Sequence, residues 1–146
     1  MGNLKKNRRH FFFPKFPWDK AVLTQEKELC QLYGLKRKKE LYTIRHKLKK
    51  MRLYFKKELK EKNKELFLQK LYKFGLLHKE ASFFSLTEEA FLKRQLQTLV
   101  FLKGFSKTIK EARQMINHKK IVCGTKIKRY PRELISLEEE QTLTTR

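Results

Sequence analysis

Residues 91–118 read FLKRQLQTLVFLKGFSKTIKEARQMINH, and this stretch decides the predicted fold of the C-terminal half. Its apolar residues recur at spacings of three and four, which indicates two helices. Thr87 predicts the start of the first helix, because it can act as an N-cap before two glutamates, and Gly104 predicts its end. Ser106 or Thr108 is expected to cap the second helix.

The residues after this stretch predict a small sheet. Residues 121–127 and 133–136 look like short strands separated by a turn at Pro131. Two helices and a small sheet are therefore expected to form one module over residues 86–137. Residues 138–146 carry three acids and one base and read as a short acidic tail.

The N-terminal half predicts a helical domain over residues 18–85, preceded by an extended arm over residues 1–17. Pro14 and Pro17 disfavour helix in the arm. Aromatic residues lie among the basic residues there: Phe11, Phe12, Phe13, Phe16 and Trp18. Such residues can stack on unpaired bases. Alternatively Phe16 and Trp18 pack against the helices, and for Trp18 we favour this core position.

Three helices are expected in the helical domain. The first runs from Thr24, its predicted N-cap, to Tyr33, and Gly34 suits a left-handed C-terminal cap. The third covers about residues 64–74 and stops at Gly75. The second, between them, has an apolar face of Leu41, Ile44, Leu48, Met51 and Phe55. Its other face is basic and consists of Lys38, Lys39, Arg45, Lys49, Lys50, Arg52, Lys56 and Lys57.

The charge of the chain predicts an anionic partner. Its 146 residues include 37 Lys and Arg against 15 Asp and Glu, a formal net charge of +22. Residues 1–60 alone carry 19 basic and 5 acidic side chains. Hydrophobic residues make up 40% of the chain, too many for a disordered basic tail. Nucleic acid is therefore the leading partner and an anionic membrane surface the second. Like charges along a basic helix face repel, so an anion that covers this face would stabilise it.

The inventory of chemistry-bearing residues argues against an enzyme. Asp19 is the only aspartate, and the five glycines form no phosphate-binding loop. Glu88 and Glu89 are expected to be an ordinary first helical turn rather than paired catalytic carboxylates. The two cysteines and four histidines show no metal-ligand spacing. We expect no catalytic residue, metal, cofactor, small-molecule substrate or membrane span, and a cytoplasmic location.

Two motifs resemble one known family. Arg94-Gln-Leu-Gln-Thr98 is similar to the RRLQT string of the S-four family of small-subunit ribosomal proteins, and residues 91–118 look like its alpha-L RNA-binding module. Pro14-Lys-Phe-Pro-Trp18, with residues 28–42, resembles the archaeal and eukaryotic branch and leans archaeal. The resemblance covers about residues 8–137.

The sequence departs from the family pattern at three places. Lys119 stands where the family usually has glycine after the helix-closing His118. The usual Asn-Gly turn of the hairpin falls at Gly124-Thr125, and Lys128 occupies a position that is usually apolar.

The resemblance implies a mostly α fold with a small β portion: a basic N-terminal helical domain plus an alpha-L module. It implies a structural constituent of the small ribosomal subunit that organises a multi-helix junction in the 5′ domain of small-subunit rRNA. Early assembly, a place near the path by which messenger RNA enters, and contact with ribosomal protein S-five follow from it. The alternative is a free-standing alpha-L RNA chaperone or ribosome-rescue factor. An amphipathic membrane-surface protein is the third hypothesis.

Within the module, Arg113 and His118 are interpreted as a shared phosphate clamp. The ordinary alternatives are a cap or an internal ion pair for Arg113, with Glu111 or an acid of the tail, and compensation of the helix dipole for His118. The predicted RNA-binding residues are Arg8, Arg9, Lys15, Lys36, Arg37, Lys38, Arg45, Lys49, Arg52, Arg94, Gln97, Lys103, Lys107, Thr108, Lys110, Arg113, His118, Lys119 and Lys120.

Overall fold

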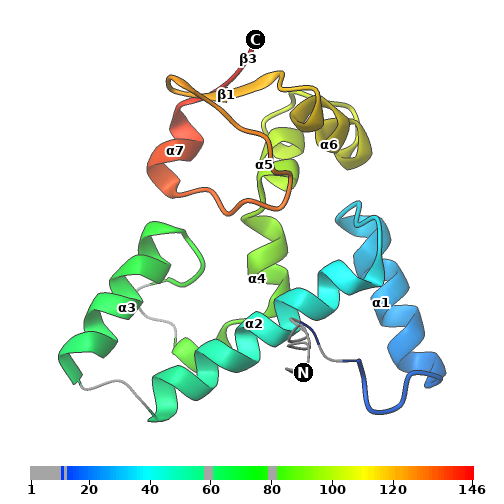
Figure 1. Cartoon of the computed structure of the whole chain (residues 1–146), viewed down its shortest axis with the longest axis vertical. Coiled ribbons are helices and arrows are strands. Elements are labelled where there is room, and N and C mark those ends of the chain that lie inside the picture. Colours follow the sequence, from blue (N-terminus) through cyan, green and yellow to red (C-terminus); the bar gives the residue numbers. More distant parts are fainter. Residues whose placement is uncertain (1–10, 12, 58–60, 79–81) are drawn as a thin grey trace, which may run out of the picture.

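The computed structural model describes residue 11 and residues 13–57, 61–78 and 82–146. These residues form two lobes (Figure 1). The helical lobe contains α1 (Lys20–Leu32), α2 (Lys38–Lys57), α3 (Glu61–Lys73), the 3₁₀ turn η1 (Phe83–Ser85) and α4 (Glu88–Lys93). The C-terminal lobe contains α5 (Leu96–Leu102), α6 (Ile109–Asn117), β1 (Ile121–Cys123), β2 (Lys126–Ile127), α7 (Leu137–Gln141) and β3 (Leu143–Thr145). The mostly α fold with a small sheet is as predicted.

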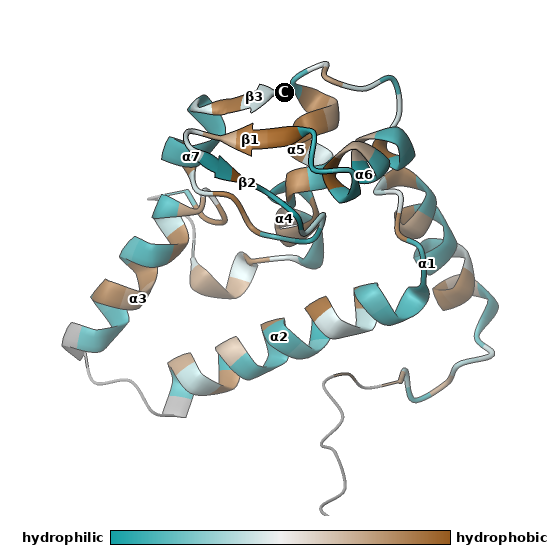
Figure 2. Ribbon diagram, turned by 45° about the horizontal axis from the view of Figure 1, so that its top comes forward, coloured by the Kyte–Doolittle hydropathy of each residue, from teal (hydrophilic) through white to brown (hydrophobic). Residues whose placement is uncertain are grey.

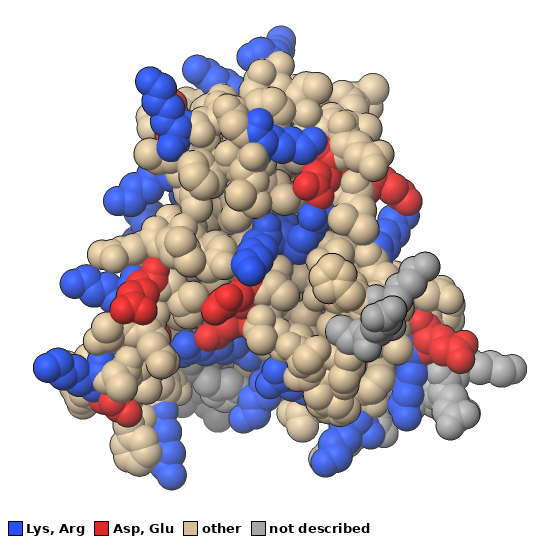
Figure 3. Space-filling model, turned by 180° about the vertical axis from the view of Figure 1, so that it is seen from behind, with Lys and Arg blue, Asp and Glu red and all other residues tan. Residues whose placement is uncertain are grey.

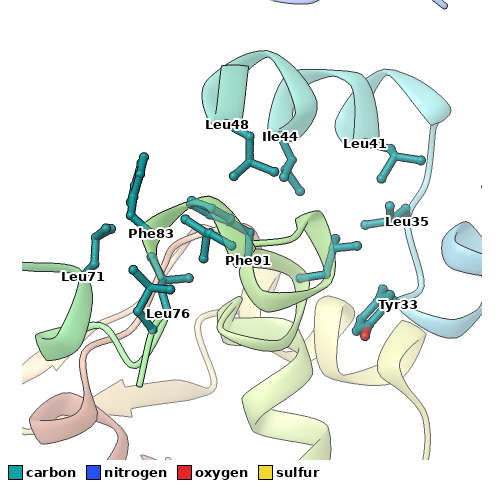
Figure 4. Close-up of a cluster of buried hydrophobic side chains, with 12 residues drawn as sticks. Tyr33, Leu35, Leu41, Ile44, Leu48, Leu71, Leu76, Phe83 and Phe91 are labelled. Atoms are coloured by element: carbon teal, nitrogen blue, oxygen red, sulfur yellow. The ribbon is translucent and has the colours of Figure 1, made fainter. Parts of the chain in front are cut away.

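The apolar face of α2 builds the core of the helical lobe. Leu41, Ile44 and Leu48 are buried; Ile44 and Leu48 point from α2 toward Phe91 of α4, and Leu41 lies beside Leu35 (Figure 4). This confirms the helix period read from the sequence. Many other positions of α2 are hydrophilic (Figure 2), although Leu53 and Tyr54 are exposed. Phe91 belongs to this core, so α4 packs with the helical lobe although it lies beyond residue 85.

The start of α1 differs from the prediction. Asp19 is its N-cap, and the Asp19 carboxylate accepts the Ala21 N–H at 3.0 Å. The prediction of Thr24 as the cap was wrong, because an earlier capping residue was available, and the Thr24 hydroxyl instead donates to the Lys20 carbonyl. Trp18, just before the helix, is 88% exposed, so its predicted core position was also wrong.

The end of α1 is as predicted and contacts the other lobe. Gly34 has φ +58°, and the Leu35 N–H donates to the Cys30 carbonyl at 2.9 Å, which is a left-handed helix cap. A Cβ at position 34 would lie 2.8 Å from Cγ2 of Ile109 on α6. Gly34 therefore serves both the backbone turn and the close approach of the two lobes.

The predicted continuous helix from Thr87 to Gly104 is two helices, and this prediction was wrong. The N–H groups of Leu96 and Gln97 donate to the carbonyls of Glu133 and Pro131, at 2.9 and 3.1 Å. A continuous helix would have used these donors internally. The segment after Pro131 therefore divides the helix into α4 and α5 by competing for its backbone hydrogen bonds.

The sheet of the C-terminal lobe also differs from the prediction. β1 lies between β2 and β3, and both pairs are antiparallel. Residues 133–136 form only an isolated bridge between Leu134 and Gln95, so the predicted strand was wrong there. The third strand is Leu143–Thr145, within the residues predicted as an acidic tail. The expected boundary at 137 thus falls inside the lobe.

Candidate nucleic-acid interface

Most of the predicted arginines bond within the fold. Arg45 donates to Glu26 and Glu88, each with a shortest N–O distance of 2.6 Å, and Glu26 is fully buried. The hydrogen bond to Glu88 raises the pKa of Arg45. The Tyr42 hydroxyl also donates to Glu26 at 2.9 Å, and burial followed by this hydrogen bond raises the pKa of Tyr42 to about 12. Lys38, 3.4 Å from Glu26, completes this network.

Arg113 does not form the predicted clamp with His118. Its guanidinium bonds both carboxylate oxygens of Glu40 on α2, at 2.8 and 3.0 Å, and the two side chains are 20% and 10% exposed. Arg113 forms an internal ion pair, as the alternative expected, but its partner is Glu40 rather than Glu111 or an acid of the tail. Gln97 is fully buried and donates to the Tyr33 carbonyl at 2.9 Å. Arg113 and Gln97 therefore fasten the two lobes together.

Three more of the predicted RNA-binding residues form hydrogen bonds or ion pairs with other residues of the protein. Arg94 contacts Glu140 at 2.6 Å, and Lys103 donates to the carbonyl of the same Glu140. Arg52 donates to the Leu86 carbonyl at 2.8 Å. Planar guanidinium groups with several fixed donors suit such pairings better than flexible ammonium groups do. The arginines thus hold the fold, and the exposed cations are mainly lysines.

The exposed cations of α2 line a groove. Lys49, Arg52 and Lys56 lie beside the exposed rings and methyls of Phe84 and Leu53, around a volume of about 550 Å³. We call this the α2 surface. It carries both positive charge and apolar area, the combination that contacts phosphates and unpaired bases.

The second group of exposed cations surrounds the ends of α6. The Thr108 hydroxyl caps the helix by accepting the Glu111 N–H at 3.2 Å, and the Lys107 N–H donates to the Glu111 carboxylate at 2.7 Å. His118 is the C-cap. We call the exposed side chains here the α6 surface: Lys107, Lys110, His118, Lys119 and Lys120.

The remaining predicted residues lie near the start of the chain. Lys36 and Arg37 are exposed just before α2. Lys15 is exposed, with its ammonium 5.4 Å from the centre of the Phe16 ring. Arg8 and Arg9 lie outside the described residues. Figure 3 shows Lys and Arg spread over one face of both lobes, with fewer Asp and Glu among them.

A groove between the lobes brings the predicted Lys36 together with three residues that were not predicted. It has a volume of about 530 Å³ and is lined by Lys36 and Lys47 from the helical lobe and Tyr130 and Arg132 from the C-terminal lobe. We call it the inter-lobe groove. The Arg-Tyr-Pro-Arg string at 129–132 could have predicted a nucleic-acid contact here, because it places an aromatic ring between two cations.

The described residues hold no group of three or more His, Cys, Asp or Glu that could bind a metal ion. Cys30 and Cys123 are free, and burial raises the pKa of the Cys30 thiol. Within the same part of the chain, no helix is long and apolar enough to cross a membrane.

Comparison with known proteins identifies the family. No model of a known family matches the chain. A small ribosomal subunit protein uS4 from Hyperthermus butylicus, however, is 40% identical over 151 residues, covering 96% of this chain and 85% of that protein. The chain belongs to the uS4 family. Proteins of the same name from Korarchaeum cryptofilum and Sulfolobus acidocaldarius are 35% and 37% identical and cover 98% and 87% of the chain. These relatives are archaeal, so the chain is an archaeal-type uS4.

The structure accommodates both lysines at which this uS4 chain departs from the predicted family pattern. Lys119 has φ +61° and is the one non-glycine residue with positive φ in the described ranges, which explains a preference for glycine there. Lys128 is buried, but its ammonium contacts Glu133 at 2.7 Å and Glu139 at 2.9 Å. Burial alone would lower the pKa of Lys128, and these two hydrogen bonds outweigh it and raise that pKa.

Proposed function

We propose that the chain is a structural, non-catalytic constituent of the small ribosomal subunit that binds its rRNA. The observation that carries this proposal is the pair of basic surfaces, one on each lobe, fastened in a fixed relation by internal Arg–Glu pairs such as Arg113–Glu40. Rigid surfaces on two lobes can contact two RNA helices at once and so recognise their relative arrangement.

The RNA element that this arrangement fits is a multi-helix junction, which we place in the 5′ domain of small-subunit rRNA. The proposal includes early assembly, a position near the path by which messenger RNA enters, and contact with ribosomal protein S-five. These details rest on the family resemblance of the sequence motifs. The proposed location of the protein is therefore the ribosome, in the cytoplasm.

The proposed phosphate contacts are the exposed cations of the two surfaces rather than the internally paired arginines. An arginine such as Arg113, which already bonds a carboxylate inside the fold, has little to offer a phosphate. The contacts are proposed to be Lys36, Arg37, Lys49, Lys56, Lys107, Lys110, His118, Lys119 and Lys120, with Lys15, Arg8 and Arg9 from the arm.

A double substitution on each surface tests the two-surface mechanism. We expect Lys49→Gln/Lys56→Gln and Lys110→Gln/Lys120→Gln each to weaken binding to a three-way RNA junction more than binding to a plain duplex. The matched control is Lys20→Gln/Lys27→Gln, which removes the same charge from exposed positions on α1. Equal losses for junction and duplex in all three variants would contradict the mechanism.

Sedimentation separates ribosomal from free-standing function. A structural constituent should stay with small subunits after a high-salt wash, because several contacts hold it at once. An RNA chaperone or rescue factor should be released, since each phosphate contact weakens as salt rises.

A further inference from the structure

The inter-lobe groove presents an aromatic ring that the fold itself does not bury. Tyr130 is 73% exposed. Its backbone is fixed: the Tyr130 carbonyl accepts the Glu133 N–H at 3.0 Å, and the next carbonyl, of Pro131, accepts the Gln97 N–H at 3.1 Å. The ring is thus held at the groove on an ordered segment, and a ligand that stacks on it loses little entropy in ordering the protein.

The charge of the groove favours an anionic ligand. Its two acids are paired inside the fold, Glu40 with Arg113 and Glu133 with Lys128, an ammonium that Glu139 shares. Lys36, Lys47 and Arg132 also line it, all three are exposed, and none of them forms an ion pair with another described residue. The lining thus holds four cations, these three and Arg113, against the two acids Glu40 and Glu133, so the groove is positively charged beside one exposed ring.

The size and the position of the groove suit one nucleotide. Its volume of about 530 Å³ lies in the range of ordinary small-ligand sites. The segment between β2 and α7, which carries Tyr130, runs along the side of the C-terminal lobe that faces α2 (Figures 1 and 2). Two RNA helices bound by the α2 and α6 surfaces would bring the unpaired linker between them toward this groove.

We propose that the inter-lobe groove binds one unpaired nucleotide of RNA. The base stacks on the Tyr130 ring, and Lys47 and Arg132 contact the flanking phosphates. The inference rests on the proposed RNA-binding function and adds to it a site for a single-stranded nucleotide. Stacking requires the aromatic ring of Tyr130 but not its hydroxyl, so the test compares a variant that keeps the ring with one that removes it.

The probe is an RNA hairpin with a single bulged 2-aminopurine nucleotide, compared with the same hairpin without the bulge. We expect the full chain to quench 2-aminopurine fluorescence and to prefer the bulged hairpin. Tyr130→Leu should weaken binding to the bulged hairpin by about 5- to 150-fold, because stacking one base on an aromatic ring is worth ~1–3 kcal/mol. Tyr130→Phe should keep both the quenching and the preference.

A charge-matched pair tests the phosphate contacts. Lys47→Gln/Arg132→Gln should lower affinity for the bulged hairpin more than Lys20→Gln/Lys27→Gln does. All substituted side chains are exposed, so thermal unfolding should stay close to that of the unsubstituted chain.

The outcomes separate the two proposals. If the unsubstituted chain binds both hairpins equally and Tyr130→Leu changes nothing, the nucleotide site is refuted while RNA binding stands. If the chain binds neither these hairpins nor small-subunit rRNA, the proposed function fails as well. A bulge preference that Tyr130→Phe abolishes would overturn stacking as the mode of binding.

Discussion

Replacing Arg113 by glutamine should destabilise the folded chain, because it breaks the ion pair that joins α6 to α2. The two hydrogen bonds to Glu40 measure 2.8 and 3.0 Å, and the side chains of Arg113 and Glu40 are only 20% and 10% exposed. Removing one partner of a buried pair costs ~3–5 kcal/mol, because the other charge is left without a counter-charge. Water reaches part of this pair, so we expect a loss near the lower end, about 3 kcal/mol.

The loss can be measured by urea unfolding followed by far-ultraviolet circular dichroism. In a chain of this size 1 kcal/mol shifts the melting temperature by about 2–4 °C, so Arg113→Gln should melt roughly 6–12 °C lower. Lys110→Gln, on the same helix but exposed, is the control and should change stability by less than about 0.5 kcal/mol. The double variant Glu40→Gln/Arg113→Gln should lose less than the sum of the single variants, because no unpaired buried charge remains.

The opposite pattern would refute this description of Arg113. If Arg113→Gln unfolds at the same urea concentration as the unsubstituted chain but loses RNA affinity, the guanidinium faces RNA and the pairing with Glu40 is not its role. The same result would restore the clamp with His118 that the sequence suggested.

Three further predictions follow from single residues. Lys119→Gly should raise stability by about 1 kcal/mol, because φ +61° strains any residue with a Cβ, whereas Lys120→Gly should not; thermal melting of both variants decides this. The hydrogen bond from Lys128 lowers the pKa of Glu139 from its ordinary value of 4.5, so the stability it contributes is present above that pH and is lost as the pH falls through the lowered pKa. Glu139→Gln should therefore lose less stability on acidification from about pH 5 to 3, which urea midpoints at each pH would show. Trp18, the only tryptophan and 88% exposed, should show the fluorescence of indole in water, with strong acrylamide quenching that bound RNA reduces; a blue-shifted, protected emission in the free chain would contradict its exposure.

The features predicted correctly are those that depend on residues close together in the sequence. The apolar spacing of Leu41, Ile44 and Leu48 identified the buried face of α2, because a helix brings residues three and four apart onto one side. Gly34 was read correctly for the same reason, since a left-handed cap is a local property.

What the sequence analysis missed depends mainly on partners distant in the chain. Arg113 and Glu40 are 73 residues apart, so counting charges could not show that they neutralise each other. The division of α4 from α5 requires carbonyls from Pro131 and Glu133, which no helix period reveals. α7 was not predicted, although the sequence contains a signal for it. Ser136 and Glu139 form a capping box, a four-residue signature that marks the start of a helix.

The structure separates the predicted site residues into exposed cations and internally paired ones. Positive charge at α2 and α6 is present at the surface, but its carriers are chiefly lysines such as Lys49 and Lys110. Arg45 and Arg113 are instead bonded to glutamates of other helices. Whether a cation faces solvent or a carboxylate is decided by tertiary packing, which spacing along the sequence does not encode.

The central claim is that the two lobes together recognise one junction of small-subunit rRNA. The most direct measurement is a hydroxyl-radical footprint of the full chain on that RNA, at a salt concentration where nonspecific contacts are weak. We predict protections that cluster on the helices of a single multi-helix junction in the 5′ domain, with the linker between those helices protected as well. Protections scattered over unrelated helices, or confined to one duplex, would contradict the claim.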